Sequence, residues 1–477
     1  MITGGMDRRQ FLKGAAAGCA MCMGGWRLFG AEAAPAPLRI VSPGCRRSKV
    51  KVAKVYLGRP GAHWPTPAMD LNAEVKRYED EFARMGKQLA DVDFFINEVV
   101  TSPEAAKKLV DQLKTADGIL VIHLSMGVTA DLRAVLAAGR PTMLFAAPYS
   151  GHEWTNFGKI MKEKDGALLD CVLSSDLDEL PIAVRPFRAI HHLREARIVN
   201  VSTRDGAPEY MKAIKEKYGT EVVRVGREQM LEAYNAIPDA EAEAETNRWI
   251  KGAEKIVEPN REEIFKSCKQ ALASQRLLDQ HDASMITIDC YGSMWRQLPA
   301  YPCIGHARLN GMGLGGMCES DLRSCVTQIL LQSISGKPGF VNDPTMDVSR
   351  NAIVLAHCMG TPKMDGPDGE TSPYKLRTIM ERQEGCVCQV RMKLGQKVTT
   401  AELLEPNKLL YFTGYIIDTP DIPRGCRTKI TVRVDGDAEK LWRNWTDGLH
   451  RVTCYGDLKR DLQRFCRFTS VEMIDEA

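Results

Sequence analysis

The first part of the chain alternates short runs of apolar, β-branched residues with longer amphipathic segments. Four of these runs are predicted strands: residues 50–57, 92–99, 118–123 and 142–147. Between them lie segments such as 72–89 and 102–116, whose apolar residues recur at helical spacing. Strands that alternate with helices, without hairpin turns between them, are typical of a parallel doubly wound sheet. The pattern therefore predicts an α/β domain over residues 38–190.

A second α/β unit is expected over residues 191–336, after a helical stretch at 181–197. Its predicted strands are the apolar runs at 198–201, 221–224 and 285–289. Residues 236–281, between the last two strands, have the length and the apolar spacing of two long helices. A further helix is predicted over residues 320–334, because the sequence SGKPG that follows would end it.

The pattern changes after residue 337. Runs such as CVCQVRMKL, KLLYFTGYIID and CRTKITVRVD alternate apolar and polar positions and are separated by short turns with Gly, Pro or Asn. This alternation is typical of antiparallel strands with one buried face. The predicted fold class is α/β: two doubly wound parallel-sheet domains, followed by a mainly antiparallel β domain over residues 337–477 that closes with a helix.

Residues 1–33 have the pattern of a targeting segment. Arg8 and Arg9 are followed by Phe11-Leu12-Lys13, a short apolar run and small residues up to Ala33. This pattern predicts a twin-arginine signal peptide cut after Ala33, and export to the periplasm by the twin-arginine translocation machinery. The alternatives are a basic arm in which two arginines stand together by chance, and a lipid attachment site at Cys19, which lacks the usual preceding leucine.

The composition is that of an ordinary globular protein, with 44% hydrophobic and 26% charged residues and a net charge of +3 over 477 residues. A nearly neutral chain of this length gives no indication of binding to nucleic acid or to an anionic membrane surface. No segment reaches the roughly 20 apolar residues of a membrane span. The sequence GRPG after the first predicted strand lacks the GxGxxG pattern, so a dinucleotide site is not supported.

Fifteen cysteines are many for an exported protein. Two of them, Cys19 and Cys22, lie in the signal, and the remaining thirteen are an odd number, so at least one is free or paired between molecules. Their spacing shows no zinc-type double CxxC, and strand alternation explains Cys386 and Cys388 better than a metal clip does. Most of the cysteines are therefore expected to be small buried residues.

Between Gly311 and Cys358 the sequence contains side chains that suit a hard metal ion. A glycine-rich turn is expected to lead to Glu319 at a helix N-terminus, where the helix dipole favours an ionised carboxylate. Asp343 is expected in an Asn-Asp-Pro turn at a strand end, and His357 ends an apolar strand, where open α/β sheets bind ligands. Each signal alone is weak, because a Glu at a helix start is more often a cap and an Asp before Pro a turn former.

Four short segments recur in order along the C-terminal half: CESD, NDP, an apolar strand that ends in HC, and GLHRVTCYGD. This series resembles the L-fucose isomerase and L-arabinose isomerase superfamily over residues 285–466. The resemblance implies an Mn²⁺ (or Mg²⁺) site held by Glu319, Asp343 and His450, and it is closer to the fucose branch because the second ligand is Asp. It makes His357 either an additional ligand, as in the arabinose branch, or a residue that orients another ligand.

The resemblance also implies a homo-oligomer, a trimer or hexamer, whose first domain contributes to a neighbouring subunit's pocket. Trp64 is a candidate substrate contact on that ground, and a surface aromatic without a role is the alternative. Tyr291 and Trp295 are candidates to stack on a sugar face, with His306 in the same region, although core packing explains such rings equally well. The chain is shorter than fucose isomerases, and an export signal is unexpected for enzymes of cytoplasmic sugar catabolism.

These residues predict a metal-dependent aldose–ketose isomerase that acts on an open-chain pentose or deoxyhexose through an enediol. A divalent cation would stabilise the enediolate, while Glu319 and Asp343 would both bind it and carry the proton. An oxygen-rich ligand set suits Mn²⁺ or Mg²⁺ better than a zinc cage does. The alternatives are another metal-dependent carbohydrate epimerase or lyase, and an exported sugar-binding protein with two hinged α/β domains.

Overall fold

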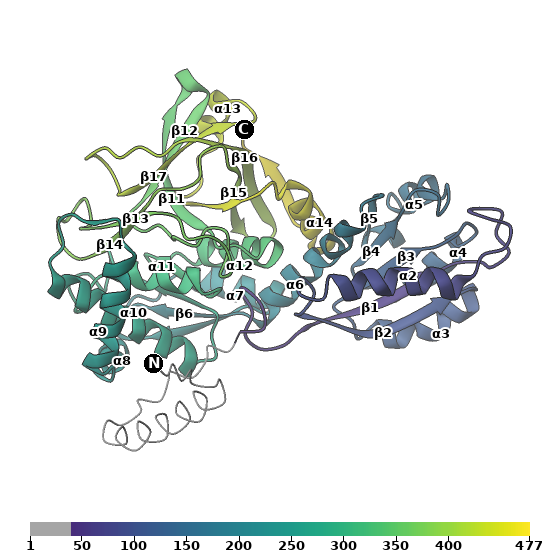
Figure 1. The fold of residues 1–477 in the computed structure, drawn as a ribbon, viewed down its shortest axis with the longest axis horizontal. Helices are drawn as coiled ribbons and strands as arrows, with labels where there is room; N and C mark the ends of the chain where they lie inside the picture. Colours follow the sequence, from purple (N-terminus) through teal and green to yellow (C-terminus); the bar gives the residue numbers. More distant parts are fainter. Residues whose placement is uncertain (1–39) are drawn as a thin grey trace, which may run out of the picture. The chain divides into compact units, whose positions relative to one another are not determined.

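The computed structural model describes residues 40–477, so the signal peptide and its cut after Ala33 lie outside the described residues. Residues 50–173 form a five-stranded parallel sheet in the order β2-β1-β3-β4-β5 (Figure 1). Its strands are β1 (Val50–Leu57), β2 (Val92–Val100), β3 (Gly118–His123), β4 (Thr142–Ala146) and β5 (Leu169–Leu173). β3 and β4 are buried along their whole length, which explains their unbroken apolar sequences. The predicted parallel sheet is confirmed, with β5 as an additional strand.

Helices pack on this sheet and begin at the side chains that cap them. Asp70 accepts hydrogen bonds from the backbone of Asn72 and Ala73 at the start of α2, and Ser102 caps α3 in the same way. The helices are α2 (Leu71–Arg84), α3 (Pro103–Leu113), α4 (Thr129–Leu136), α5 (Trp154–Ile160), η1 (Lys164–Gly166) and η2 (Leu177–Val184). The strand order leaves a switch point between β1 and β3, and sheets of this kind bind ligands at the carboxyl ends of the strands near such a point.

Helix α6 (Arg185–Glu195) leads into a second parallel sheet, with the strand order β7-β6-β9-β10. Its strands are β6 (Arg197–Val201), β7 (Glu221–Val225), β9 (Met285–Ile288) and β10 (Gly315–Cys318). The first three match predicted strands, whereas β10 was expected to be part of a glycine-rich turn. The order of these four strands repeats that of the first four strands of the first sheet, so the two α/β units share one topology.

The helices of the second unit include the two long ones predicted within residues 236–281. The longer of the two, α10, starts at a reciprocal capping box between Asn260 and Glu263. The helices are α7 (Pro208–Tyr218), α8 (Arg227–Asn235), α9 (Asp239–Gly252), α10 (Arg261–Gln280), α11 (Cys303–Gly311) and α12 (Leu322–Ser335). Helix α12 is capped by Asp321 and ends at Gly336, whose φ of 71° is left-handed. It is buried on nearly all sides because it packs on α6, on the second sheet and on strands of the C-terminal part.

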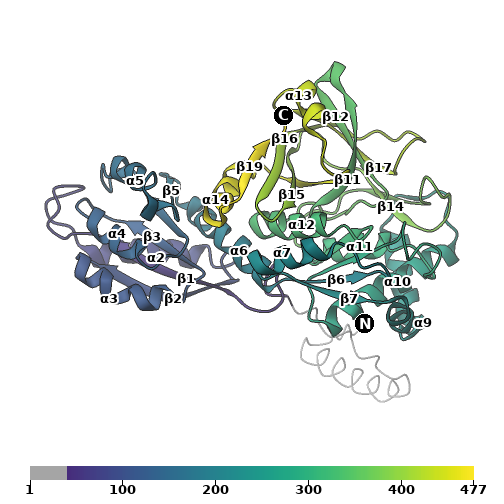
Figure 2. The same ribbon diagram turned by 180° about the vertical axis from the view of Figure 1, so that it is seen from behind.

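From residue 340 the chain forms a closed, six-stranded antiparallel barrel (Figure 2). The strands follow one another in the order β15-β18-β11-β12-β17-β16, and β15 also pairs with β16, which closes the ring. They are β11 (Phe340–Asp347), β12 (Ala352–His357), β15 (Lys397–Glu405), β16 (Lys408–Asp418), β17 (Thr428–Val434) and β18 (Arg451–Tyr455). The predicted antiparallel C-terminal part is confirmed; its closure was not evident from the sequence.

The remaining elements attach to the barrel and the second sheet. Strands β8 (Lys255–Ile256), β13 (Tyr374–Arg377) and β14 (Val387–Val390) form a small sheet, and η3 (Val348–Arg350), α13 (Ala438–Asn444), α14 (Lys459–Thr469) and β19 (Glu472–Asp475) complete the chain. The predicted closing helix is α14, but the chain does not end there. β19 follows it and pairs in parallel with β16, so the expectation of a terminal helix is wrong.

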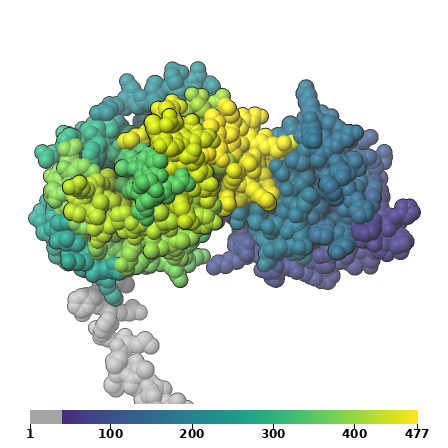
Figure 3. Space-filling model, turned by 90° about the horizontal axis from the view of Figure 1, so that it is seen from above, coloured from purple at the N-terminus to yellow at the C-terminus, as the bar shows by residue number. Residues whose placement is uncertain are grey.

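Helix α14 connects the C-terminal part to the first sheet (Figure 3). Arg467 donates hydrogen bonds to the backbone oxygens of Leu169 and Met161, and Phe468 stacks on Phe187 with ring centroids 6.3 Å apart. Helix α14, which follows the barrel in sequence, thus packs directly on residues of the first α/β unit, and no long linker separates the two within the described residues. The domain boundaries at residues 190 and 336 stay predictions.

All thirteen cysteines in residues 40–477 are free thiols, and most are buried. Cys386 and Cys388 belong to an apolar cluster that includes Leu376 and Val390, as strand alternation predicted. The interpretation of most cysteines as small core residues is therefore confirmed for the described part of the chain.

Candidate metal centre

Glu319 lies in a strained connection between β10 and α12. Its φ is 65° and that of Ser320 is 56°, two successive left-handed residues that are not glycine. The backbone N–H of Glu319 donates to the carbonyl of Ile288 at 2.8 Å, and the Ser320 hydroxyl donates to Asn200 at 2.7 Å. Such strain costs roughly 1–3 kcal/mol per residue and is concentrated at functional sites. The surrounding contacts thus hold Glu319 at the carboxyl end of the second sheet.

This arrangement corrects the expected route to Glu319. Gly311 lies in α11, and Gly315 and Gly316 lie in β10, where a Cβ on Gly316 would stand 2.5 Å from the Cα of His306. Of the glycines in this segment, only Gly313 has a positive φ, of 83°. The glycines therefore permit close packing of β10 on α11 rather than a ligand-binding turn.

Asp343 and His450 meet at the edge of the barrel. His450 directly precedes β18, and its Nε2 lies 3.3 Å from Oδ1 of Asp343 and 3.9 Å from Oε2 of Glu319. Asp343 was expected in a turn at a strand end, but β11 runs through it: residues 340–342 pair with β18, and residues 343–347 pair with β12. Asp343 therefore stands where its strand changes partners.

His357 completes the group as the last residue of β12. Its Nε2 lies 3.9 Å from Oε1 of Glu319, and its ring is edge-on to that of His450 with centroids 5.5 Å apart. The strand was predicted correctly, but its sheet is the antiparallel barrel rather than an open α/β sheet. We refer to Glu319, Asp343, His357 and His450 as the carboxylate–histidine group.

Asp321 supports this group from behind, a role that the sequence did not indicate. Its Oδ2 lies 2.9 Å from Nδ1 of His450, while its other oxygen caps α12 through the backbone of Arg323 and Ser324. A carboxylate on one ring nitrogen of a metal-binding histidine orients the ring and aims the other nitrogen at the metal. The only sequence signal was the position of an Asp at the helix start, which also fits simple capping.

Burial and charge shift the pKa values in this group in opposite directions. Burial alone would lower the pKa of His450, but the carboxylates of Asp321 and Asp343 outweigh it and raise that pKa to about 10. Burial lowers the pKa of His357 to about 4, assisted by the charge of His450. Burial also raises the pKa of Glu319, with the charge of His450 opposing it. The group therefore concentrates negative charge around one imidazole.

A buried ion cluster holds the strand that follows His450. Arg451 is fully buried and donates to both carboxylate oxygens of Glu476, at 2.8 and 3.1 Å, and also to Glu402. It further donates to the carbonyl of His450 at 2.9 Å. Burial raises the pKa of Glu402 to about 7, because Arg451 compensates only part of it. Arg451 thus fixes the backbone from which His450 projects.

Two of the predicted substrate contacts are packed against the connection between β13 and β14. Tyr291 and Trp295 lie in the loop after β9, where the guanidinium of Arg382 stands 3.7 Å from the Trp295 ring and 5.2 Å from the Tyr291 ring. His306 is completely buried in α11, with its Nδ1 3.5 Å from the sulfur of Cys318. Its position is that of a core residue behind the group.

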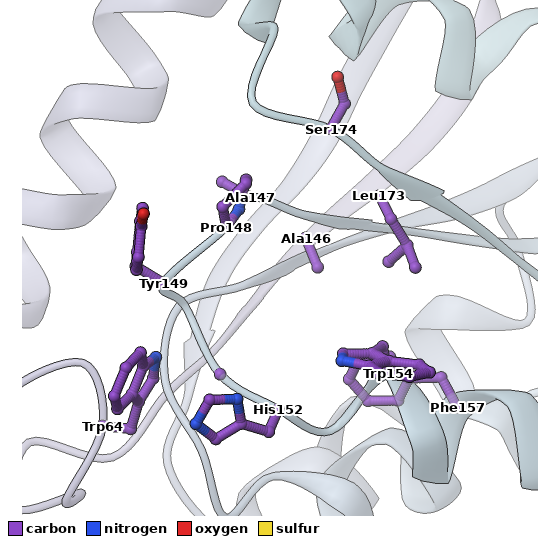
Figure 4. Close-up of a pocket in the computed structure, with 11 residues that line it drawn as sticks. Trp64, Ala146, Ala147, Pro148, Tyr149, His152, Trp154, Phe157, Leu173 and Ser174 are labelled. Carbon is purple, nitrogen blue, oxygen red and sulfur yellow. The ribbon is translucent and has the colours of Figure 1, made fainter.

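Trp64 lies elsewhere, in an aromatic pocket at the carboxyl ends of the first sheet (Figure 4). Its ring packs against His152 with centroids 4.5 Å apart. The pocket has a volume of about 420 Å³ and includes the exposed rings of Tyr149 and Trp154, which the sequence reading did not single out. None of its lining residues belongs to the carboxylate–histidine group.

The chemistry of the donors fits a divalent cation. One atom each of Glu319, His357 and His450 lie within 4.8 Å of one another, with Asp343 beside His450. His450 Nε2 is buried and makes no hydrogen bond of good geometry within residues 40–477, although Asp343 Oδ1 lies 3.3 Å away. A buried polar atom without a partner needs an explanation, and a bound ion is one. Two carboxylates and two imidazole rings form a mixed oxygen and nitrogen donor set that suits a divalent cation.

Comparison with known proteins finds a match for one segment of the chain, at its N-terminus. A family model of the TAT (twin-arginine translocation) pathway signal sequence matches residues 5–25. The protein is therefore exported to the periplasm by the twin-arginine machinery, as predicted. A search of curated proteins found no match. None of the helices within the described residues is long and apolar enough to cross a membrane.

Proposed function

We propose that this protein is an exported, metal-dependent aldose–ketose isomerase that acts on an open-chain pentose or deoxyhexose. The observation that carries the proposal is the convergence of Glu319, His357 and His450 from three separate elements, around a buried His450 nitrogen that makes no hydrogen bond of good geometry in the described structure. A stability role alone does not account for them, because strained and unsatisfied groups at one point cost free energy. Mn²⁺ is the proposed cofactor, with Mg²⁺ as the alternative.

The relationship to L-fucose isomerases belongs to this proposal. It is supported by the order of the CESD, NDP, HC and GLHRVTCYGD segments, and by a fold of two parallel sheets followed by an antiparallel barrel. In that superfamily a β-rich C-terminal domain carries the metal-binding histidine. Assembly into a trimer or hexamer is part of the same inference.

The proposed chemistry assigns the proton transfers to the two carboxylates. Isomerisation moves one proton between C1 and C2 and another between their oxygens, and the bound cation would supply charge stabilisation for the enediolate. Glu319 takes the proton from the carbon next to the carbonyl and returns it to the neighbouring carbon. Its burial raises its pKa, which makes the protonated form easier to reach. Asp343 transfers the second proton, between the oxygens on C1 and C2. Tyr291 and Trp295 contact the sugar.

The proposal is tested by loading the mature protein with Mn²⁺ and assaying a panel of pentoses and deoxyhexoses. We expect close to one bound Mn²⁺ per chain and conversion between an aldose and its ketose. Glu319→Gln should lower the rate at least about 10²-fold, because a positioned acid/base group contributes roughly 10²–10⁴-fold. Glu405→Gln, an exposed carboxylate at the end of β15, is the matched control and should leave the rate unchanged.

Isomerisation that persists in Glu319→Gln would overturn the proposal, as would a wild-type protein that takes up no cation after reconstitution. Product analysis also separates this activity from the related ones. An epimer or a dehydrated sugar would indicate a metal-dependent epimerase or lyase at the same group.

The aromatic pocket of the first sheet favours a second candidate function, that of a sugar-binding protein. Trp64, Tyr149 and Trp154 present rings of the kind that stack on sugars, and two of the three are largely exposed. Sugar binding that survives Glu319→Gln but is lost in Trp154→Ala would support this function instead.

A further inference from the structure

A second group of metal-binding side chains lies next to the carboxylate–histidine group, at the end of β12. Cys358 directly follows His357, and its sulfur lies 3.8 Å from that of Cys426. One oxygen of Glu381 is 3.2 Å from the sulfur of Cys426, and the other is 3.6 Å from that of Cys358. We refer to these three residues as the thiol group. One donor atom from each lies within 4.8 Å of the others.

The barrel fixes the two cysteines at this separation. β12 and β17 are antiparallel neighbours, with His357 opposite Thr428, so Cys358 leaves one strand where Cys426 approaches the other. Glu381 comes from the connection between β13 and β14, which contacts the loop after β9: Arg382 stacks on Trp295, and Tyr291 donates to Glu381 at 3.4 Å. Three separate segments therefore supply the donors.

The separations match those of a tetrahedral zinc site. Zinc–sulfur bonds of about 2.3 Å hold two thiolates about 3.8 Å apart, and a carboxylate oxygen at about 2.0–2.2 Å lies about 3.5 Å from each sulfur. The observed values are 3.8 Å between the sulfurs, 3.2 Å from the Cys426 sulfur to one oxygen of Glu381, and 3.6 Å from the Cys358 sulfur to its other oxygen. A disulfide requires a sulfur–sulfur distance of about 2.05 Å, so it would need the strand ends to move.

Burial and charge also fit an ion. Cys358 is buried, Cys426 is half-buried and Glu381 is exposed, so the group opens to solvent on one side. The buried guanidinium of Arg427 interacts electrostatically with both Cys358 and Glu381, so positive charge lies beside the group. Thiolates select Zn²⁺ over Mn²⁺ or Mg²⁺, whereas the carboxylate oxygens of the neighbouring group also suit those harder ions.

We infer that Cys358, Glu381 and Cys426 form a Zn²⁺ site, distinct from the carboxylate–histidine group and beside it. Binding releases the two thiol protons to solvent. Three protein ligands leave the fourth tetrahedral position to a water. The ion ties the connection between β13 and β14 to the barrel next to His357, and so fixes the loop that carries Tyr291 and Trp295.

The test uses the full mature protein, purified with a phosphine reductant, and Co²⁺ as a spectroscopic substitute for Zn²⁺. Thiolate ligands give Co²⁺ an intense sulfur-to-metal charge-transfer band that oxygen and nitrogen ligands do not give. We expect one equivalent of Co²⁺ to produce this band, and one equivalent of Zn²⁺ to abolish it. Cys426→Ser should lose the band, and Glu381→Gln should weaken binding. Cys171→Ser, which changes another half-buried cysteine, is the matched control and should keep it.

Glu319→Gln should retain the band, which separates this site from the proposed isomerase site: failure of either leaves the other standing. In the Glu319→Gln background, Zn²⁺ should raise the unfolding temperature more when Cys426 is intact than when Cys426→Ser is also present. Absence of the band in the reduced wild type would overturn the proposal. So would equal bands in wild type and Cys426→Ser, or a wild-type protein that after reduction rapidly regains a disulfide between residues 358 and 426 and binds no metal.

Discussion

Two neighbouring residues at the end of β12 belong to groups of opposite chemistry. His357 joins a carboxylate–histidine group that is largely enclosed between the second sheet and the barrel, and Cys358 joins a thiol group that opens to solvent. In the first group, Asp321 is hydrogen-bonded to the ring of His450, and Arg451 of the buried ion cluster donates to the His450 carbonyl. The second is held only by strand register and a loop.

The comparison shows how one strand end can present donor atoms of two chemical kinds. A histidine surrounded by carboxylates suits a hard cation, and paired sulfurs suit a thiophilic one. The two groups also differ in how firmly their side chains are held before a metal binds. Buried charges require partners that compensate them, whereas neutral thiols do not. The carboxylate–histidine group should therefore depend strongly on distant charged residues, and the thiol group should depend on little beyond its own ligands.

The largest expected effect is the loss of stability when the cation of the buried ion cluster next to His450 is removed. Arg451→Leu leaves Glu402 and Glu476 buried without their cation, so the free energy of unfolding should fall by about 3–5 kcal/mol. Urea denaturation of the metal-free protein measures this change. An effect below about 1 kcal/mol would mean that the cluster does not support the carboxylate–histidine group as the comparison requires.

The pH dependence of stability should reveal the same cluster. The pKa of Glu402 rises from an ordinary value near 4.5 to about 7 on folding, so the folded state holds the proton more tightly. Its contribution to stability is complete below about pH 4.5 and is lost as the pH rises through about 7, a change on the order of 3 kcal/mol. Glu402→Gln should lack this decline in urea titrations across that range. Glu405→Gln, on the same strand, should retain it.

Asp321→Asn tests the support of the histidine itself. The asparagine can still cap α12, but it orients His450 less strongly, so affinity for Mn²⁺ should fall about 10–100-fold. Isothermal titration with Mn²⁺ measures this loss. Co²⁺ binding at the thiol group should be unchanged in the same variant, and a parallel loss at both groups would break the distinction between them.

The smallest expected effect is on the stability of the metal-free thiol group. Cys426→Ala should change the free energy of unfolding by less than about 0.5 kcal/mol, because the side chain is half-buried and its hydrogen-bond partner Glu381 is exposed. Urea denaturation in the presence of a chelator measures this. A loss of 2 kcal/mol or more would show that the cysteine is a structural residue before any metal binds.

The sequence predicted much of this molecule because its signals are local. The strands at 50–57, 118–123 and 285–288 are short β-branched runs bounded by turn residues, and the helices within 236–281 have helical apolar spacing. The twin-arginine signal is likewise local, since it is read as a linear motif.

Where the sequence reading failed, a distant contact overrode a local preference. Gly315 and Gly316 suggested a turn but form a strand in which Met285 packs against Gly315 and His306 of α11 against Gly316, too closely for a side chain at either position. Pro344 suggested that β11 stops at Asp343, but the strand continues by exchanging β18 for β12 as its partner. The carboxylate at residue 321 fitted a plain helix cap until His450 was placed beside it.

The sequence by itself determined that the chain carries an export signal, that two units alternate strands and helices, and that antiparallel strands follow. It also supplied Glu319, Asp343, His357 and His450 as candidates. Only the tertiary structure decided that β15 and β16 close a barrel, and that this barrel brings residues more than 100 positions apart to within 4 Å. The physical reason is that register and closure depend on pairing between strands remote in sequence, whereas periodicity and capping act within a few residues.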